Sequence, residues 1–220
     1  MKKIILILVC VFAAMLSSCK NTVNLEMYLS EVRHSVYKYQ GEDYTVTVYL
    51  EEKESPYLSD GFVSEMKKYV TIKIEDYKSS LSDASIKLAY GDTEILGKFE
   101  YSPLNGKFTA QIEVSTLPSE SEMTATVKNE GEEKSFILTK LNSSGKISYQ
   151  TALDKVAYAK SDEIEKALSG GGTSIETRVR IISEGESVYY YVAIIDKTGK
   201  ESAYLVDGYS GEILAEKTIS

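Results

Sequence analysis

The chain of 220 residues is poor in the side chains that most enzymes use for acid–base and metal chemistry. It has one histidine, two cysteines, three prolines and no tryptophan. A histidine-based zinc site or a Ser-His-Asp triad would therefore have to be built around His34 alone. The Gly-x-Ser-x-Gly sequence that positions a serine nucleophile in many hydrolases is also missing. The composition thus disfavours an enzyme, and we interpret His34 as a surface or half-buried structural residue.

The N-terminus lacks an apolar run long enough to span a bilayer. Residues 4–16 carry no charge and follow Lys2 and Lys3, but they are fewer than the roughly 20 residues that a transmembrane helix needs. A basic start followed by a short apolar segment is typical of a cleaved signal peptide. We therefore predict that residues 1–18 are a signal peptide and that the protein lies outside the cytoplasm.

The end of this leader, Leu16-Ser17-Ser18-Cys19, resembles the lipobox of bacterial lipoproteins. The resemblance implies that the thiol of Cys19 receives a diacylglycerol and that Cys19 becomes the first mature residue. Two acyl chains anchor a protein stably to a lipid bilayer, whereas one chain does so only marginally. The alternative is an ordinary secretory signal with a chance cysteine. The prediction is a membrane-anchored lipoprotein of the cell envelope, with residues 19–43 as its tether and leading segment.

Little cysteine and little positive charge would remain after cleavage. Cys10 lies inside the apolar run and would leave with it, so no disulfide pair and no catalytic thiol would be left. The net charge is −8, and loss of Lys2 and Lys3 would bring it to −8 − 2 = −10. An acidic surface argues against nucleic acid and anionic lipid as main partners.

From Tyr44 onward the apolar residues alternate with polar ones, which is typical of half-buried strands. Turn residues such as Gly91-Asp92 and Asn105-Gly106 separate the runs. The seven runs are YTVTVYLEE, YVTIKIED, ASIKLAYG, EILGKFEY, GKFTAQIEV, EMTATVKN and EKSFILTK. This spacing predicts an immunoglobulin-like β-sandwich over residues 44–142. The Cys, Trp and Cys landmarks of antibody domains are missing, so the likeness is one of architecture only.

A polar, glycine-containing break at Leu141–Lys146 precedes a different pattern. Ser148 can cap a helix over Tyr149–Tyr158, and a second short helix over Asp162–Leu168 leads to a Gly170–Gly172 linker. Three strand-like runs follow, SIETRVRIIS, SVYYYVAIID and ESAYLVDGYSGEILAEKT. The prediction is a small helix-plus-antiparallel-sheet domain over residues 147–220, and an α+β protein overall.

This C-terminal third resembles the PepSY domain. The resemblance is carried by YQTALDKVAYAK, YYYVAIIDKTGK and, above all, AYLVDGYSGEILA, with Gly208 where the family usually has alanine. PepSY domains occur in the propeptides of thermolysin-like metalloproteases and as separate modules of secreted or membrane-attached proteins. A peptidase-inhibiting or chaperoning role has been proposed for them. The resemblance implies the same fold and the same kind of role here.

The last of these stretches predicts a tight turn between two strands. Asp207 can accept backbone N–H groups, Ser210 can add a weaker bond, and Gly211 can adopt a positive φ before Glu212. We interpret the four residues as structural, because no base or further ligand accompanies them in a catalytic or metal set. The acids at Glu51, Glu52, Glu54, Asp60, Asp76 and Asp83 lack a calcium-loop spacing and are interpreted as solvated loops. No metal site and no cofactor is predicted.

Tyr189-Tyr190-Tyr191 is the candidate partner-binding surface. Alternation places Tyr189 and Tyr191 on one face and Tyr190 on the other, and either face could bind a partner or simply pack inside the protein. We therefore predict a non-catalytic module that binds a protein or peptide, with inhibition or chaperoning of a secreted peptidase as one form of that role. The alternative is a surface adhesin or carbohydrate-binding lipoprotein that uses the sandwich. Carboxylate-only chemistry stays open, although no spacing singles out an acid pair.

Overall fold

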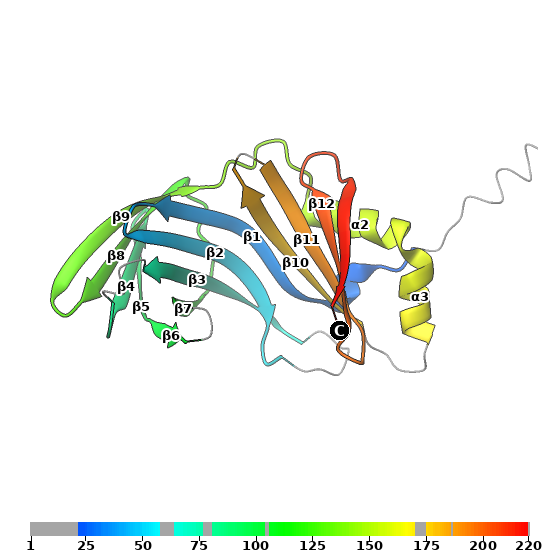
Figure 1. Ribbon diagram of the computed structural model, residues 1–220, viewed down its shortest axis with the longest axis horizontal. Coiled ribbons are helices and arrows are strands. Elements are labelled where there is room, and N and C mark those ends of the chain that lie inside the picture. The colour runs from blue at the N-terminus through cyan, green and yellow to red at the C-terminus, as the bar shows by residue number, and fades with distance from the viewer. Residues whose placement is uncertain are drawn as a thin grey trace, which may run out of the picture.

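The computed structural model describes residues 22–57, 64–76, 81–103, 106–169, 175–185 and 187–219. Within these ranges one sheet of thirteen strands carries two α-helices on part of one face (Figure 1). Several sequence predictions lie outside the described residues, namely the signal peptide, the lipidation of Cys19, the Gly170–Gly172 linker, and the roles of Asp60 and Asn105.

The helices and strands follow one another along the chain in this order. They are η1 (Leu25–Tyr28), β1 (Leu29–Gln40), β2 (Tyr44–Glu54), β3 (Met66–Asp76), β4 (Ser85–Tyr90), β5 (Thr93–Lys98), β6 (Glu100–Ser102), β7 (Lys107–Val114), β8 (Glu122–Asn129), β9 (Glu132–Lys140), α2 (Tyr149–Ala159), α3 (Ser161–Ser169), β10 (Glu176–Glu184), β11 (Ser187–Ile195), β12 (Glu201–Asp207) and β13 (Ile213–Ile219).

The alternating runs form strands because one side of each is apolar and buried. All seven predicted runs contain a strand, so these positions are confirmed. Their buried inward side chains form one core and are at most 8% exposed. This core includes Val46, Val48, Leu50, Val70, Ile72, Ile74, Ile86, Leu88, Ala125 and Leu138. Strand periodicity thus predicts which face is buried, as expected for a half-buried sheet.

The strands from β1 to β9 curl around this core. One row runs β1-β2-β3-β7-β6, and a second runs β1-β9-β8-β4-β5. β5 contacts β7, and among the described residues no backbone pairing joins them. The arrangement is therefore a nearly closed antiparallel sheet rather than two stacked layers (Figure 1).

β1 is the strand that joins this curled part to the C-terminal strands. It pairs with β2 over most of its length. On its other edge it first pairs in parallel with β10, through Leu29–Arg33, and then with β9, at Tyr37 and Lys38. The sheet order β13-β12-β11-β10-β1-β2 is therefore continuous. Residues 19–43 were predicted as a tether and leading segment, and their described part, residues 22–43, supplies a short 3₁₀ helix and a central strand.

The predicted fold class is consequently wrong. Of the residues that the structure describes, 59% are in strands and 13% in helices, and they form neither an immunoglobulin-like sandwich nor a separate PepSY-like helix-plus-sheet domain. The physical reason is that β10 buries its second edge against β1, whose residues lie about 146 positions earlier. Alternation predicts strands one at a time and carries no information on such a distant parallel pairing.

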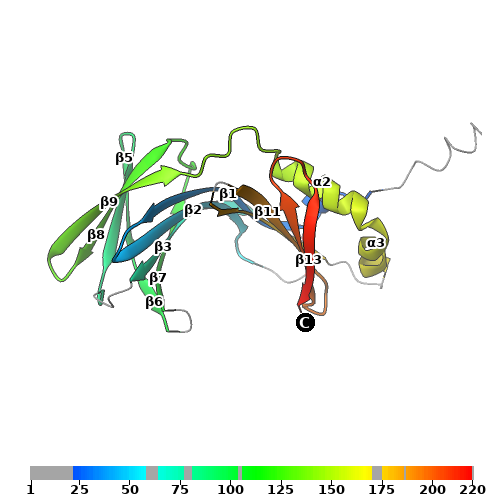
Figure 2. The ribbon, with the colours of Figure 1, turned by 45° about the horizontal axis from the view of Figure 1, so that its top comes forward.

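Two helices cover one face of the C-terminal strands (Figure 2). The side chain of Ser148 accepts a hydrogen bond from Thr151 N at 3.1 Å, so the predicted cap of α2 is confirmed. Leu153 and Val156 of α2 pack with Ile164 of α3 in a second core. That core also takes in Leu25, Leu29, Val32, Val179, Ile181, Val188, Tyr190, Val192, Tyr204 and Val206. We call the opposite face of the sheet, turned away from α2 and α3, the outer face. None of the described helices has the length and apolarity that a membrane crossing requires.

Candidate interaction surface

The turn between β12 and β13 is built around Asp207. Its Oδ1 accepts hydrogen bonds from Tyr209 N at 3.0 Å, Ser210 N at 2.7 Å and Ser210 Oγ at 2.9 Å. These bonds, with the backbone bond from Ser210 first, lower the pKa of Asp207. Gly211 has a φ of +74°, and Glu212 N donates to Ser210 Oγ at 3.2 Å. The turn therefore sets the direction of β13, and its polar groups bond to one another.

Gly208 lets this turn approach β11 closely. Its N–H donates to the carbonyl oxygen of Val188 at 2.8 Å, and a Cβ at this position would lie 2.5 Å from that oxygen. The Val188 carbonyl belongs to the backbone of β11, which pairs with a strand on each side. It therefore cannot move away without disturbing the sheet. Close backbone approach thus explains glycine at this position.

We expect Gly208→Ala to destabilise the protein by about 1–3 kcal/mol, as overpacking against rigid backbone does. The new methyl group would force the turn away from Val188 and lengthen the bond from Gly208 N. Urea unfolding followed by circular dichroism measures the change. An unchanged unfolding midpoint would contradict the steric explanation.

β13 is an edge strand of the sheet. Among the described strands it pairs with β12 alone, so its other backbone edge faces outward (Figure 2). Six of its seven residues are exposed, including Leu214 at 49% and Ile219 at 42%. Apolar side chains on an unpaired strand edge are the features that an added strand recognises.

The three tyrosines of β11 have different surroundings. Tyr190 is 1% exposed on the helix side, where its hydroxyl donates to the Ile147 carbonyl at 2.7 Å and accepts from Lys146 at 2.9 Å. Burial raises the pKa of Tyr190 to about 12. Tyr189 and Tyr191 are half-buried on the outer face, and the Tyr191 hydroxyl donates to Glu201. Tyr190 is therefore a core residue and is not available to a partner.

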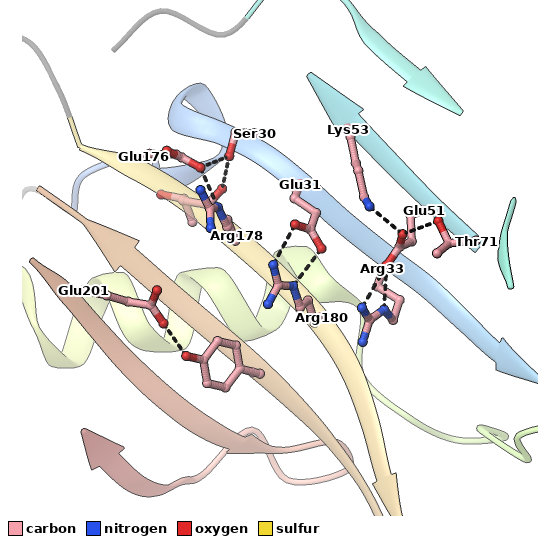
Figure 3. Close-up of polar contacts among 12 residues, drawn as sticks. Ser30, Glu31, Arg33, Glu51, Lys53, Thr71, Glu176, Arg178, Arg180 and Glu201 are labelled. Carbon is pink, nitrogen blue, oxygen red and sulfur yellow. Dashed lines mark hydrogen bonds and ion pairs between the residues drawn. The ribbon is translucent and has the colours of Figure 1, made fainter. Parts of the chain in front are cut away.

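The outer face carries a chain of ion pairs across β10, β1 and β2 (Figure 3). At its centre the Glu51 carboxylate, 1% exposed, pairs with Arg33 and with Lys53, each at 2.8 Å. Thr71 Oγ1 also donates to it at 2.9 Å. Burial acts to raise the pKa of Glu51, but the charges of Arg33 and Lys53 outweigh it and the pKa is lowered. The earlier interpretation of Glu51 as a solvated loop acid is wrong, because it lies buried inside β2.

The parallel pair β1 and β10 has its own ion pairs. Arg180 donates to both carboxylate oxygens of Glu31, at 2.7 and 2.8 Å. Glu176 accepts from Ser30 and from Arg178 (Figure 3). It also accepts from Tyr57. The Glu31–Arg180 and Ser30–Glu176 contacts join β1 to β10 where the two halves of the sheet meet. Their sequence signal was opposite charges at alternate positions, EVR in β1 and ETRVR in β10.

Three other acids named in the sequence analysis have separate partners in the described structure. Glu54 is 8% exposed and accepts from Ser64 N at 2.8 Å, Asp76 accepts from Leu81 N at 2.8 Å, and Asp83 pairs with Lys98 at 3.1 Å. In the part of the chain that the structure describes, no three His, Cys, Asp or Glu side chains are grouped to hold a metal ion.

His34 lies on the helix side of β1 rather than on the outer face. Its Nε2 is 3.4 Å from Glu52 Oε1, and its ring meets that of Tyr149 edge-on, with centroids 5.8 Å apart. Burial lowers the pKa of His34 below 6.5; the Glu52 charge opposes this, and Lys146 and Lys68 add to it. The neutral imidazole is therefore the form that fits the folded protein.

We expect stability to fall as the pH drops below 6.5, because the unfolded chain then binds a proton that folded His34 resists. This contribution is complete above 6.5 and is lost as the pH falls toward the lower pKa of the folded state. In His34→Gln the decline between about pH 6.5 and 5 should be smaller. Unfolding free energies measured across this range test it, and equal slopes for the two proteins would contradict it.

The comparisons with known proteins give no family assignment. No protein-family model matches the chain. A search of curated proteins found no match either. A function for this chain must therefore be argued from its own residues and their geometry.

Proposed function

We propose that this protein is a lipid-anchored, non-catalytic module of the cell envelope that binds a protein or peptide partner. The leader and Cys19 support the anchor and the location outside the cytoplasm. The single observation that carries the binding role is β13, an exposed edge strand with apolar side chains. Its mechanism is strand addition: an extended segment of the partner pairs with the free edge and packs on Leu214 and Ile219.

The fixed position of β13 supports this mechanism. The Asp207 turn sets its direction, and Gly208 holds the turn against β11. On the helix side, Glu216 of β13 pairs with Lys160, which also lies 3.7 Å from Glu163 of α3. An edge that is already ordered loses little conformational freedom when a partner binds.

The chemistry of the described residues favours binding over catalysis. The single histidine packs between Glu52 and Tyr149, and the central carboxylates of the outer face are held in ion pairs with arginine. The sequence of residues 147–220 resembles PepSY domains, although these residues form no separate domain here, and on that sequence resemblance we propose a secreted peptidase as the partner, inhibited or assisted in folding.

The test compares the full chain with a Leu214→Lys/Ile219→Lys variant. Charged side chains on an exposed edge oppose strand addition without disturbing a core. The control is Leu96→Lys, because Leu96 is 73% exposed on β5, away from β13. We expect partner binding to weaken by about tenfold or more, roughly 1.4 kcal/mol, in the double variant only.

The measurement is affinity for secreted and envelope proteins, followed by inhibition assays on any peptidase retained. Equal binding by the double variant and the control would contradict the edge-strand mechanism. Retention of glycans in place of proteins would favour the adhesin alternative.

A further inference from the structure

Positive charge gathers on the outer face of β1, β2 and β3, although the whole chain has a net charge of −8. Arg33 and Lys53 both pair with the single carboxylate of Glu51. Lys73, on the same face of β3 as Thr71, adds a third cation. The cluster of Arg33, Lys53, Lys73 and Glu51 therefore carries a local charge of 3 − 1 = +2.

Among the described residues Lys73 forms no ion pair. No carboxylate among the described residues lies within ion-pair distance of its Nζ. The nearby carboxylate of Glu75 pairs instead with Lys107, at 2.8 Å. Burial, then the charge of Arg33, lowers the pKa of Lys73, and the more distant Glu51 carboxylate opposes this only in part. The fold thus holds a half-buried ammonium beside two other cations, which is unfavourable unless something else compensates it.

Tyr49 sits beside two of these cations. The guanidinium carbon of Arg33 lies 3.8 Å from the centroid of its ring, and Lys73 Nζ lies 5.3 Å from the same centroid. Both cations are attracted electrostatically to the face of the ring. Next to Lys73 the sheet presents Thr47 of β2 and Thr109 of β7, which lie opposite it in register. Hydroxyl groups therefore flank the cation across three strands.

We propose that the surface formed by Arg33, Tyr49 and Lys73 binds the carboxylates of an acidic polypeptide segment lying across β2 and β3. A carboxylate placed near Lys73 supplies the missing counter-charge, and Arg33 and Lys53 strengthen the attraction. This site lies apart from the β13 edge, and the proposal holds whether or not that edge binds a partner.

Charge complementarity over a short range favours a peptide over larger polyanions. At physiological salt, interactions between charges are largely screened beyond about 8 Å. A carboxylate of a bound peptide next to the cluster would therefore interact mainly with its net positive charge. A nucleic acid duplex or an anionic bilayer would also meet the acidic remainder of the surface. A short extended peptide can contact the cluster without lying against the acidic rest of the surface.

The test measures binding of a fluorescent ten-residue peptide of alternating glutamate and serine to the purified full chain, at low and at physiological salt. We expect saturable binding that weakens with salt, and weakens about tenfold in Lys73→Gln. Lys73→Arg should retain it. The control Lys87→Gln should bind normally, because Lys87 lies on β4, paired with Glu94 at 3.3 Å.

Thermal unfolding of the same variants shows whether each is folded. Lys73→Gln should be at least as stable as the natural chain, since it removes a charge that its neighbours repel. The proposal is overturned if the peptide shows no saturable binding at low salt, or if Lys73→Gln binds it as well as the natural chain. Tighter Lys73-dependent binding to phosphatidylglycerol vesicles than to the peptide would overturn the acidic polypeptide as the occupant.

Discussion

Glu51→Gln should cost about 3–5 kcal/mol of unfolding free energy, the range measured when one partner of a buried ion pair is removed. The glutamine keeps the size of the side chain and can still accept from Thr71, so the loss isolates the charge. It leaves Arg33 at 12% exposure and Lys53 at 29% without their shared anion. Urea unfolding gives the change in the free energy of unfolding. If the slope of this free energy against urea concentration is unchanged, the variant exposes as much surface on unfolding as the natural chain does.

The matched control is Glu94→Gln. Glu94 pairs with Lys87 at 3.3 Å, but the two side chains are 60% and 44% exposed. Exposed pairs contribute about 0–1 kcal/mol, so the control should stay close to the natural chain. Equal losses for the two variants would contradict a special role for the buried pair.

The same carboxylate should govern part of the acid sensitivity. The folded pKa of Glu51 is lowered from 4.5, so its contribution is present above that value and is lost as the pH falls through the folded pKa. Glu51→Gln should therefore have a flatter stability profile than the natural chain below about pH 4.5.

Cys19→Ala should abolish incorporation of labelled palmitate into the protein. Under the lipoprotein proposal the Cys19 thiol is the attachment point, and stable anchoring would depend on the two acyl chains attached there. Mass spectrometry of the mature N-terminus should find diacylglycerol on Cys19 in the natural chain. Cys10→Ala is the matched control, because Cys10 would be removed with the leader, and it should incorporate label normally. Label retained by Cys19→Ala, or an unmodified natural N-terminus, would contradict the lipoprotein prediction.

Local patterns in the sequence predicted the elements well. Alternation located β2 because Val46, Val48 and Leu50 line one face, and Ser148 marked the start of α2. These signals lie within a few residues of one another, so they can be read directly from the sequence. The position of Tyr190 opposite Tyr189 and Tyr191 follows from the same rule, although alternation alone does not say which face is buried.

The arrangement of the elements could not be predicted in the same way. Val32 lies beside Val179 in a parallel pair, and only the folded chain brings these distant residues together. The bulge between Arg33 and Ser35 also breaks the alternation in β1, so this segment does not show the regular pattern that marks a strand. The burial of Glu51 could not be predicted for a related reason. Its ion-pair partner Arg33 lies in β1, the strand whose alternation the bulge interrupts.

The outer face has two kinds of charged residue, and they suggest different roles. Glu31 and Arg180 satisfy each other and fasten β1 to β10. Lys73 has no such partner among the described residues and contributes nothing comparable to the fold. Residues that a fold tolerates without compensation are candidates for function, because natural proteins often retain local instability where they bind.

Amide hydrogen exchange of the full chain, alone and with its captured partner, tests the proposed binding mechanism most directly. Strand addition predicts that the partner slows exchange in Ile213–Ile219, where the described structure leaves one backbone edge unpaired. The Leu214→Lys/Ile219→Lys variant should lose this protection. Unchanged exchange throughout β13, with protection confined to other strands, would contradict the account.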